Sequence, residues 1–158
     1  MQINTLRFGT IEINKDDIIT VPEGVIGFPD IKRYVILDMA EDTPFKLFQA
    51  VDEPSVGFII IDPVLFKPDY TVQVRKEDLY SLSAENINEI ATMVIVTIPE
   101  DPSNMTANLR GPLLINLKSK LAKQHVLTDD TYTTRHRIIS SFSPFHNIVE
   151  EKAGVNSL

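Results

Sequence analysis

The sequence contains no cysteine and no tryptophan, and only six of its 158 residues are glycine. Without cysteine the chain forms no disulfide, binds no zinc through thiolates and has no thiol nucleophile. It also has no apolar run of about 18 residues and no apolar stretch at its N-terminus, so it predicts neither a membrane span nor a secretory signal. These absences favour a cytoplasmic protein that does not interact with membranes.

Sequence motifs of common catalytic, nucleotide and metal sites are also missing. The chain has no G-x-S-x-G, no G-x-G-x-x-G and no phosphate-binding G-K-[ST] motif. The histidines His125, His136 and His146 lie 11 and 10 positions apart, which matches no usual zinc-ligand spacing. We therefore expect no catalytic residue, no metal and no cofactor. An enzyme would be favoured only if His125, His136 and an aspartate came within hydrogen-bonding reach of one another.

What the chain does have is enough apolar material for one folded domain, since 43% of its residues are hydrophobic. Its net charge is −7, and the charge is unevenly distributed. Residues 1–74 contain 12 acids and 6 bases, whereas residues 75–158 contain 10 acids and 9 bases. An acidic surface repels phosphate backbones and attracts basic proteins, so we expect no direct binding of nucleic acid.

One segment, residues 110–137, runs against this trend with six bases and two acids. Lysines along the edge of a sheet protect that edge from pairing with another chain, and we interpret the segment in this way. A phosphate-binding site is the alternative.

Short apolar runs rich in β-branched and aromatic residues, separated by turn residues, recur along the chain and predict β-strands. Ile3–Phe8 and Thr10–Ile13 form a predicted hairpin around Gly9. The other predicted strands are Ile18–Val21, Tyr34–Leu37, Phe45–Val51, Val56–Ile61, Met93–Ile98, Leu113–Leu117 and His125–Leu127. Many short strands in one domain predict a mainly β fold, a small barrel-like domain with one or two short helices.

Helical periodicity is convincing only from Arg75 to Ile90, and Ser83 is a plausible N-cap that divides this segment into two short helices. The loop Pro22–Pro29 contains two prolines and two glycines around apolar residues, and we expect it to place these apolar side chains inward as a plug. We assign residues 1–137 to the barrel domain and residues 138–158 to a C-terminal tail whose order the sequence leaves open.

The segment Thr97–Asn116 contains a strand, a stiff polar turn and a second strand, and it looks like a surface for presentation to a partner. Its two prolines restrict the backbone, and Asp101, Ser103 and Asn104 are able to bond back to nearby amides. A methionine beside small polar residues suits an adaptable contact. The candidate partner-binding residues are Met105, Thr106, Asn108, Pro102 and Asn104. Packing of Met105 in the core is the alternative.

Several sequence blocks resemble a known family, the bacterial FliW flagellar assembly factors. The resemblance covers nearly the whole domain and is most specific in the block IPEDPSNMTANL. It rests on GTIEIN (Gly9–Asn14), VPEGVIGF (Val21–Phe28), DTPFKLFQAVD (Asp42–Asp52), PVLFKPDY (Pro63–Tyr70), VTIPEDPSNMTANLRGPLLIN (Val96–Asn116) and YTTRH (Tyr132–His136). The tail from Ile138 to Leu158 matches no pattern of the family.

The resemblance implies a non-enzymatic cytoplasmic protein with two competing partners, flagellin and CsrA. CsrA is a small basic RNA-binding protein that represses flagellin translation, and the family relieves this repression by binding it. Flagellin bound to the same protein prevents that capture, so the protein senses the flagellin level. Flagellin's terminal segments are amphipathic helices, which dock into apolar grooves. We expect a monomer, although the sequence does not determine the oligomeric state.

A small-ligand-binding barrel is the alternative function. It would require an enclosed apolar pocket with a few convergent polar groups.

Overall fold

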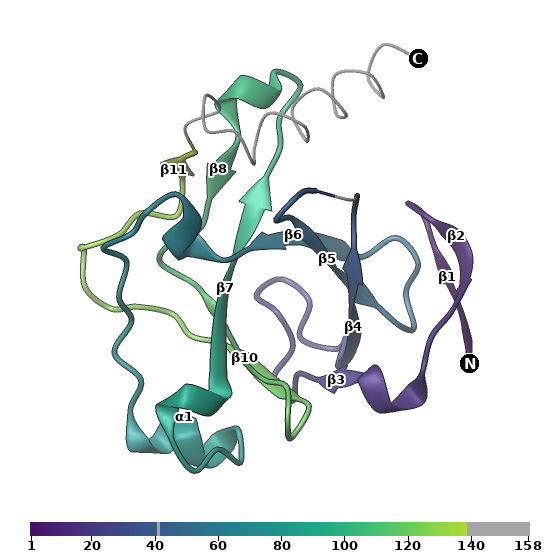
Figure 1. Cartoon of the computed structure of the whole chain (residues 1–158), viewed down its shortest axis with the longest axis horizontal. Coiled ribbons are helices and arrows are strands. Elements are labelled where there is room, and N and C mark those ends of the chain that lie inside the picture. The colour runs from purple at the N-terminus through teal and green to yellow at the C-terminus, as the bar shows by residue number, and fades with distance from the viewer. Residues whose placement is uncertain (41, 139–158) are drawn as a thin grey trace.

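Seven β-strands close into a barrel in the computed structural model, which describes residues 1–40 and 42–138 (Figure 1). They are β3 (Ile19–Thr20), β4 (Arg33–Asp38), β5 (Lys46–Ala50), β6 (Gly57–Ile61), β7 (Ile90–Thr97), β9 (Leu113–Asn116) and β10 (Leu121–Gln124). The barrel closes because β7 pairs with β9 as well as with β6, and because β10 pairs with β3. Only the β10–β3 pairing is parallel. The predicted mainly β, barrel-like fold is confirmed.

The remaining elements lie outside this barrel. The hairpin β1–β2 forms a separate two-stranded sheet beside it, and β8 and β11 extend the main sheet beyond β7 (Figure 1). These elements are β1 (Gln2–Thr5), β2 (Gly9–Glu12), β8 (Thr106–Ala107), β11 (His136–Arg137), the helix α1 (Lys76–Ser81) and the 3-10 turns η1 (Lys15–Asp17), η2 (Pro63–Leu65), η3 (Ile87–Glu89) and η4 (Pro102–Asn104).

Successive residues of each strand point to opposite faces of the barrel wall, one toward the interior and the next toward the outside. On β7, Met93 and Ile95 point to the interior cluster, whereas Val94 and Val96 belong to the outer cluster. The interior is filled by side chains, including the stacked rings of Tyr34 and Phe48, whose centroids lie 4.5 Å apart. The interior cluster contains Ile19, Val21, Val25, Tyr34, Phe48, Ala50, Ile60, Leu113, Ile115 and Ala122. Among the described residues, the hollows lined by interior residues, of about 410 and 520 Å³, open to the surface and are not enclosed, which gives no support to the small-ligand alternative.

Two further apolar clusters lie outside the barrel wall. One packs on the outer face of β5, β6 and β7 and includes Phe45, Met105 and Ile138. The other lies where Ile3 and Ile13 meet Val35 and Val51. The strands are thus buried on both faces over much of their length, which explains why the sequence shows continuous apolar runs rather than strict alternation.

The predicted pair of helices is only partly correct. α1 ends at Ser81, and Ser83 has a φ of 53° and is not an N-cap. The amides of Ser83 and Ala84 donate to the carbonyls of Tyr80 and Leu79, the pairing of a Schellman motif, so Ser83 takes the left-handed position after the helix. The second helical turn is the 3-10 turn η3, capped by Asn86.

The predicted strand His125–Leu127 is wrong, because the strand there is β10, which ends at Gln124. β10 is paired on both sides, so its one lysine, Lys123, does not protect a free edge. Lys123 instead donates to Asp78 at 2.7 Å, and Lys118 lies 3.5 Å from Glu89. Sequence composition showed the excess of bases in this segment but not their tertiary partners.

The predicted domain boundary at residue 137 falls one residue before the end of the described structure. Ile138 is 2% exposed and its amide donates to the carbonyl of Met105, so it belongs to the packed domain. The predicted tail from residue 139 onward lies outside the described residues. Within the described residues, no helix is sufficiently long and apolar to cross a bilayer.

Candidate partner-binding groove

The polar turn before β8 is held by its own side chains. Asp101 caps η4, and its carboxylate accepts hydrogen bonds from the amide and hydroxyl of Ser103 at 3.1 and 2.7 Å. These bonds lower the pKa of Asp101. Pro102 occupies the first position of η4, where a missing N–H costs nothing. The expected stiff turn is therefore present.

Two of the five candidate residues are not on the surface. Met105 is fully buried in the outer apolar cluster, and Pro102 is buried beside it. Met105 is therefore packed in the core, which the sequence analysis gave as the alternative to partner contact. The amide of Met105 donates to the carbonyl of Pro102 at 3.1 Å and closes the 3-10 turn that precedes the buried side chain. Met105 thus shapes the segment and offers no contact of its own to a partner.

The other three candidates line one groove. Asn104, Thr106 and Asn108 lie along a hollow of about 520 Å³ at the end of the barrel where the β3–β4 loop lies. Its apolar lining comes from strands distant in sequence, with Phe58 on β6 and Ile95 on β7. The full lining is Val25, Ile26, Phe58, Ile95, Thr97, Pro99, Asn104, Thr106, Asn108, Gln124, Thr134 and Arg135. An apolar hollow with a rim of amides and hydroxyls suits an amphipathic segment.

Two amide side chains organise the wall of this groove. Asn108 accepts hydrogen bonds from the amides of Arg110 and Gly111 at 3.0 and 2.9 Å. Gln124 donates to the carbonyl of Gly111 and accepts from the amide of Ile26, both at 2.9 Å. Both side-chain groups of Gln124 are therefore used to join the β3–β4 loop to the segment before β9.

The loop of residues 22–29 differs from the predicted inward plug. Val25 is buried, as expected, but Ile26 is 64% exposed at the rim of the groove. The amide of Phe28 donates to the carbonyl of Val25 at 2.7 Å, which closes a turn with Ile26 and Gly27 at its corner. Gly27 has a φ of 92°, as the third position of a type II turn requires. This turn points Ile26 outward.

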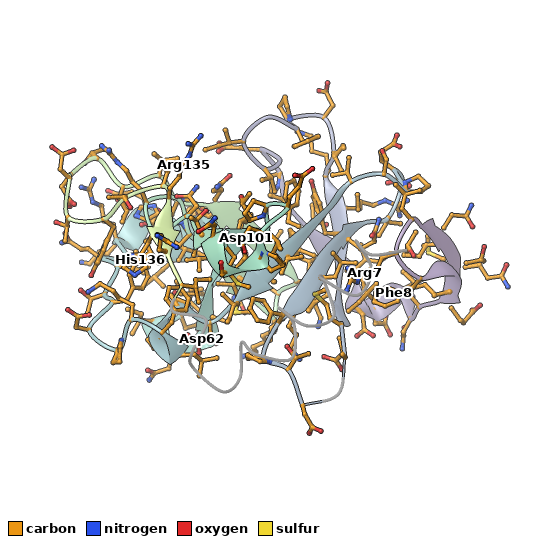
Figure 2. All side chains as sticks on the ribbon, turned by 90° about the horizontal axis from the view of Figure 1, so that it is seen from above. Arg7, Phe8, Asp62, Asp101, Arg135 and His136 are labelled. Carbon is orange, nitrogen blue, oxygen red and sulfur yellow. The ribbon has the colours of Figure 1, made fainter. Side chains whose placement is uncertain are left out.

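Arg135 supplies the charge of the groove. It is the only charged side chain among the described residues that line it, and no described residue forms an ion pair or hydrogen bond with its guanidinium. The nearby acid Asp101 already faces Arg137, which also donates to the side chain of Asn104 at 2.8 Å. Figure 2 shows Arg135 and Asp101 in the same half of the molecule, away from Arg7 and Phe8 on the first hairpin.

Sequence reasoning missed Ile26, Phe58, Gln124 and Arg135 as groove residues. Only two of these left a usable signal. Ile26 lies in the block VPEGVIGF and Arg135 in YTTRH, and both blocks contribute to the family resemblance. Phe58 and Gln124 look like ordinary strand residues, because their position beside the polar turn depends on how the barrel closes.

The residues considered for catalysis do not assemble. Nδ1 of His125 lies 3.7 Å from Asp78 Oδ1, beyond hydrogen-bonding distance, and the same oxygen is occupied by Lys123. His136 lies instead beside the ring of Phe66, and burial lowers its pKa. His146 lies outside the described residues. Within residues 1–40 and 42–138, no group of three or more histidine, aspartate or glutamate side chains is arranged to hold a metal.

Comparison with known proteins agrees with this fold and with the motifs. The model of the family "FliW protein" matches residues 2–138. The flagellar assembly factor FliW of Thermoanaerobacter pseudethanolicus is 45% identical over 140 residues, covering 88% of this chain and 93% of the relative. That of Treponema denticola is 39% identical over 143 residues, covering 90% and 97%. A crystal structure of the flagellar assembly factor FliW is 34% identical, with a TM-score of 0.82 over 88% of this chain and 97% of that one.

Proposed function

Since this chain belongs to the FliW family of non-enzymatic flagellar assembly factors, we propose that it acts in the cytoplasm by binding the translational repressor CsrA, with flagellin as the competing partner. When flagellin is exported, the freed protein captures CsrA and flagellin synthesis resumes. Family membership over residues 2–138 is the observation that carries this proposal.

The described surface supports a binding role. The groove joins an apolar lining to polar groups that have a fixed geometry, and three of the sequence-predicted contact residues line it. The net charge of −7 favours approach of a basic protein such as CsrA, since opposite potentials accelerate encounter and exclude wrong partners. An exchange between two partners also requires comparable affinities, because about 1.4 kcal/mol changes relative occupancy tenfold.

Size-exclusion chromatography of the purified protein with CsrA, with flagellin and with both tests the proposal. We expect one complex with each protein alone, and displacement of CsrA when flagellin is added in excess. A stable ternary peak would contradict competition between the partners. Absence of both binary complexes would contradict the proposed function itself.

A further inference from the structure

The groove combines a rigid apolar projection with one positive charge that has no partner among residues 1–40 and 42–138. Ile26 projects at one part of the rim, while Arg135 supplies the charge. Of the amide side chains around them, Asn108 and Gln124 already bond to backbone groups within the protein. A partner therefore has two main features to match. One is the exposed side chain of Ile26, which we call the apolar knob, and the other is the guanidinium of Arg135.

The knob is fixed before any partner binds. The amide of Ile26 is held by Gln124, and the turn closes through the 2.7 Å bond from Phe28 to Val25. The ring of Phe28 meets Phe58 edge to face, with centroids 5.5 Å apart. A loop whose backbone is held in this way loses little conformational entropy on binding, which suits an interface anchor.

The charge of the groove is opposite to that of the protein. The chain carries −7 overall, yet no described lining residue is acidic and Arg135 is unpaired among the described residues. A guanidinium binds a carboxylate through two parallel hydrogen bonds. A basic partner would meet like charge here, which is unfavourable.

From this charge complementarity, we infer that the groove is a docking site for an amphipathic helix that places apolar side chains against Ile26 and Phe58 and a carboxylate against Arg135. This inference rests on the proposed function and deepens it. Of the two proposed partners, the family resemblance gives flagellin amphipathic terminal helices and makes CsrA basic, so flagellin is the partner that we assign to this groove. The positive charge of the groove therefore favours flagellin over CsrA at this site, although the two proteins compete for the same molecule.

Two variants test the inference, each with a matched control elsewhere on the surface. Arg135→Glu reverses the charge of the groove, and Lys76→Glu makes the same change in charge on α1. Ile26→Ser removes the knob, and Ile87→Ser removes a similarly exposed isoleucine, 55% against 64%, from outside the groove. All four side chains are exposed, so circular-dichroism melts are expected to match the unmodified protein.

Isothermal titration calorimetry with purified flagellin and with purified CsrA gives the readout. We expect Arg135→Glu and Ile26→Ser to weaken flagellin binding by about tenfold or more, while both controls remain within about twofold. We expect Arg135→Glu to leave CsrA binding unchanged or stronger, because a like charge has been removed. Higher salt is expected to weaken flagellin binding less in Arg135→Glu than in the unmodified protein.

Other outcomes overturn the inference in distinguishable ways. Unchanged flagellin affinity in both groove variants means that the groove does not bind flagellin. A loss confined to CsrA assigns the groove to the basic partner, and a loss of self-association assigns it to a second copy of this chain. If the unmodified protein binds neither flagellin nor CsrA, the proposed function fails, whatever the groove binds.

Discussion

The side-chain oxygen of Gln124 accepts a 2.9 Å hydrogen bond from the backbone N–H of Ile26, although 98 positions separate the two residues. The nitrogen of the same side chain donates to the carbonyl of Gly111. One amide group therefore fixes the β3–β4 loop against the segment before β9 and sets the position of the exposed Ile26. Rigidity at the rim of the groove depends on this contact.

Replacing Gln124 with alanine should loosen the loop without unfolding the barrel. Two hydrogen bonds are lost, each worth about 1 kcal/mol, so we expect the free energy of unfolding to fall by about 1 to 2 kcal/mol. Hydrogen exchange at the Ile26 amide should accelerate more than exchange at amides of β5. The exposed Gln73 offers a matched control as Gln73→Ala. If the Ile26 amide were equally protected from hydrogen exchange in both variants, Gln124 would not hold the loop.

The two glycines of this loop should differ in their tolerance of a side chain. A Cβ on Gly24 would lie 2.3 Å from the carbonyl oxygen of Phe28, whereas a Cβ on Gly27 would meet nothing within 4 Å. Both have positive φ, so Gly27→Ala should cost about 1 kcal/mol through backbone strain alone. Gly24→Ala should lower the free energy of unfolding by clearly more, because the new Cβ would also clash with the carbonyl of Phe28. Urea denaturation of the two variants checks this order, and equal losses would contradict it.

Met105 should respond to substitution as a core residue. Met105→Asp would bury a carboxylate in an apolar cluster, so we expect a loss of about 4 kcal/mol or more, or failure to fold. Met105→Leu preserves volume and should cost less than about 1.5 kcal/mol. Thermal denaturation followed by circular dichroism distinguishes the two. A folded Met105→Asp variant of normal stability would contradict the burial of this side chain.

The ion pair between Asp78 and Lys123 should make the free energy of unfolding depend on pH. Burial of Asp78 acts to raise its pKa, but the hydrogen bonds from Lys123 and the Arg75 amide outweigh burial, and the pKa falls below its usual 3.8. A carboxyl with a depressed pKa in the folded state contributes stability above its unfolded pKa. That contribution is lost as pH falls through the folded value.

Asp78→Asn should therefore reduce stability near pH 7 by about 1 to 3 kcal/mol, with a smaller difference from the unmodified protein below the ordinary Asp pKa. Urea denaturation at several pH values from 7 to 3 measures this difference. Asp16→Asn, at an exposed carboxyl in η1, is the control. A difference between the Asp78 variant and the unmodified protein that did not change with pH would contradict the pairing.

Local patterns in the sequence were sufficient for some of these features. β-Branched and aromatic runs such as Phe45–Val51 predicted strands because the pleated backbone accommodates those side chains regardless of their partners. The turn at Asp101 was also predictable, since its hydrogen bonds join residues only two positions apart. Absence of cysteine excluded disulfides and thiol chemistry, and the sequence blocks identified the family.

Tertiary structure alone decided which face each side chain occupies. Burial of Met105 and exposure of Ile26 depend on how a turn is oriented against the rest of the barrel, since both side chains are large and apolar. The groove joins residues from the β3–β4 loop, from β6, β7 and β10 and from the segment before β11, so no window of sequence contains it. Closure of the barrel, through the pairings β7–β9 and β10–β3, creates this surface because it brings strands distant in sequence to one end.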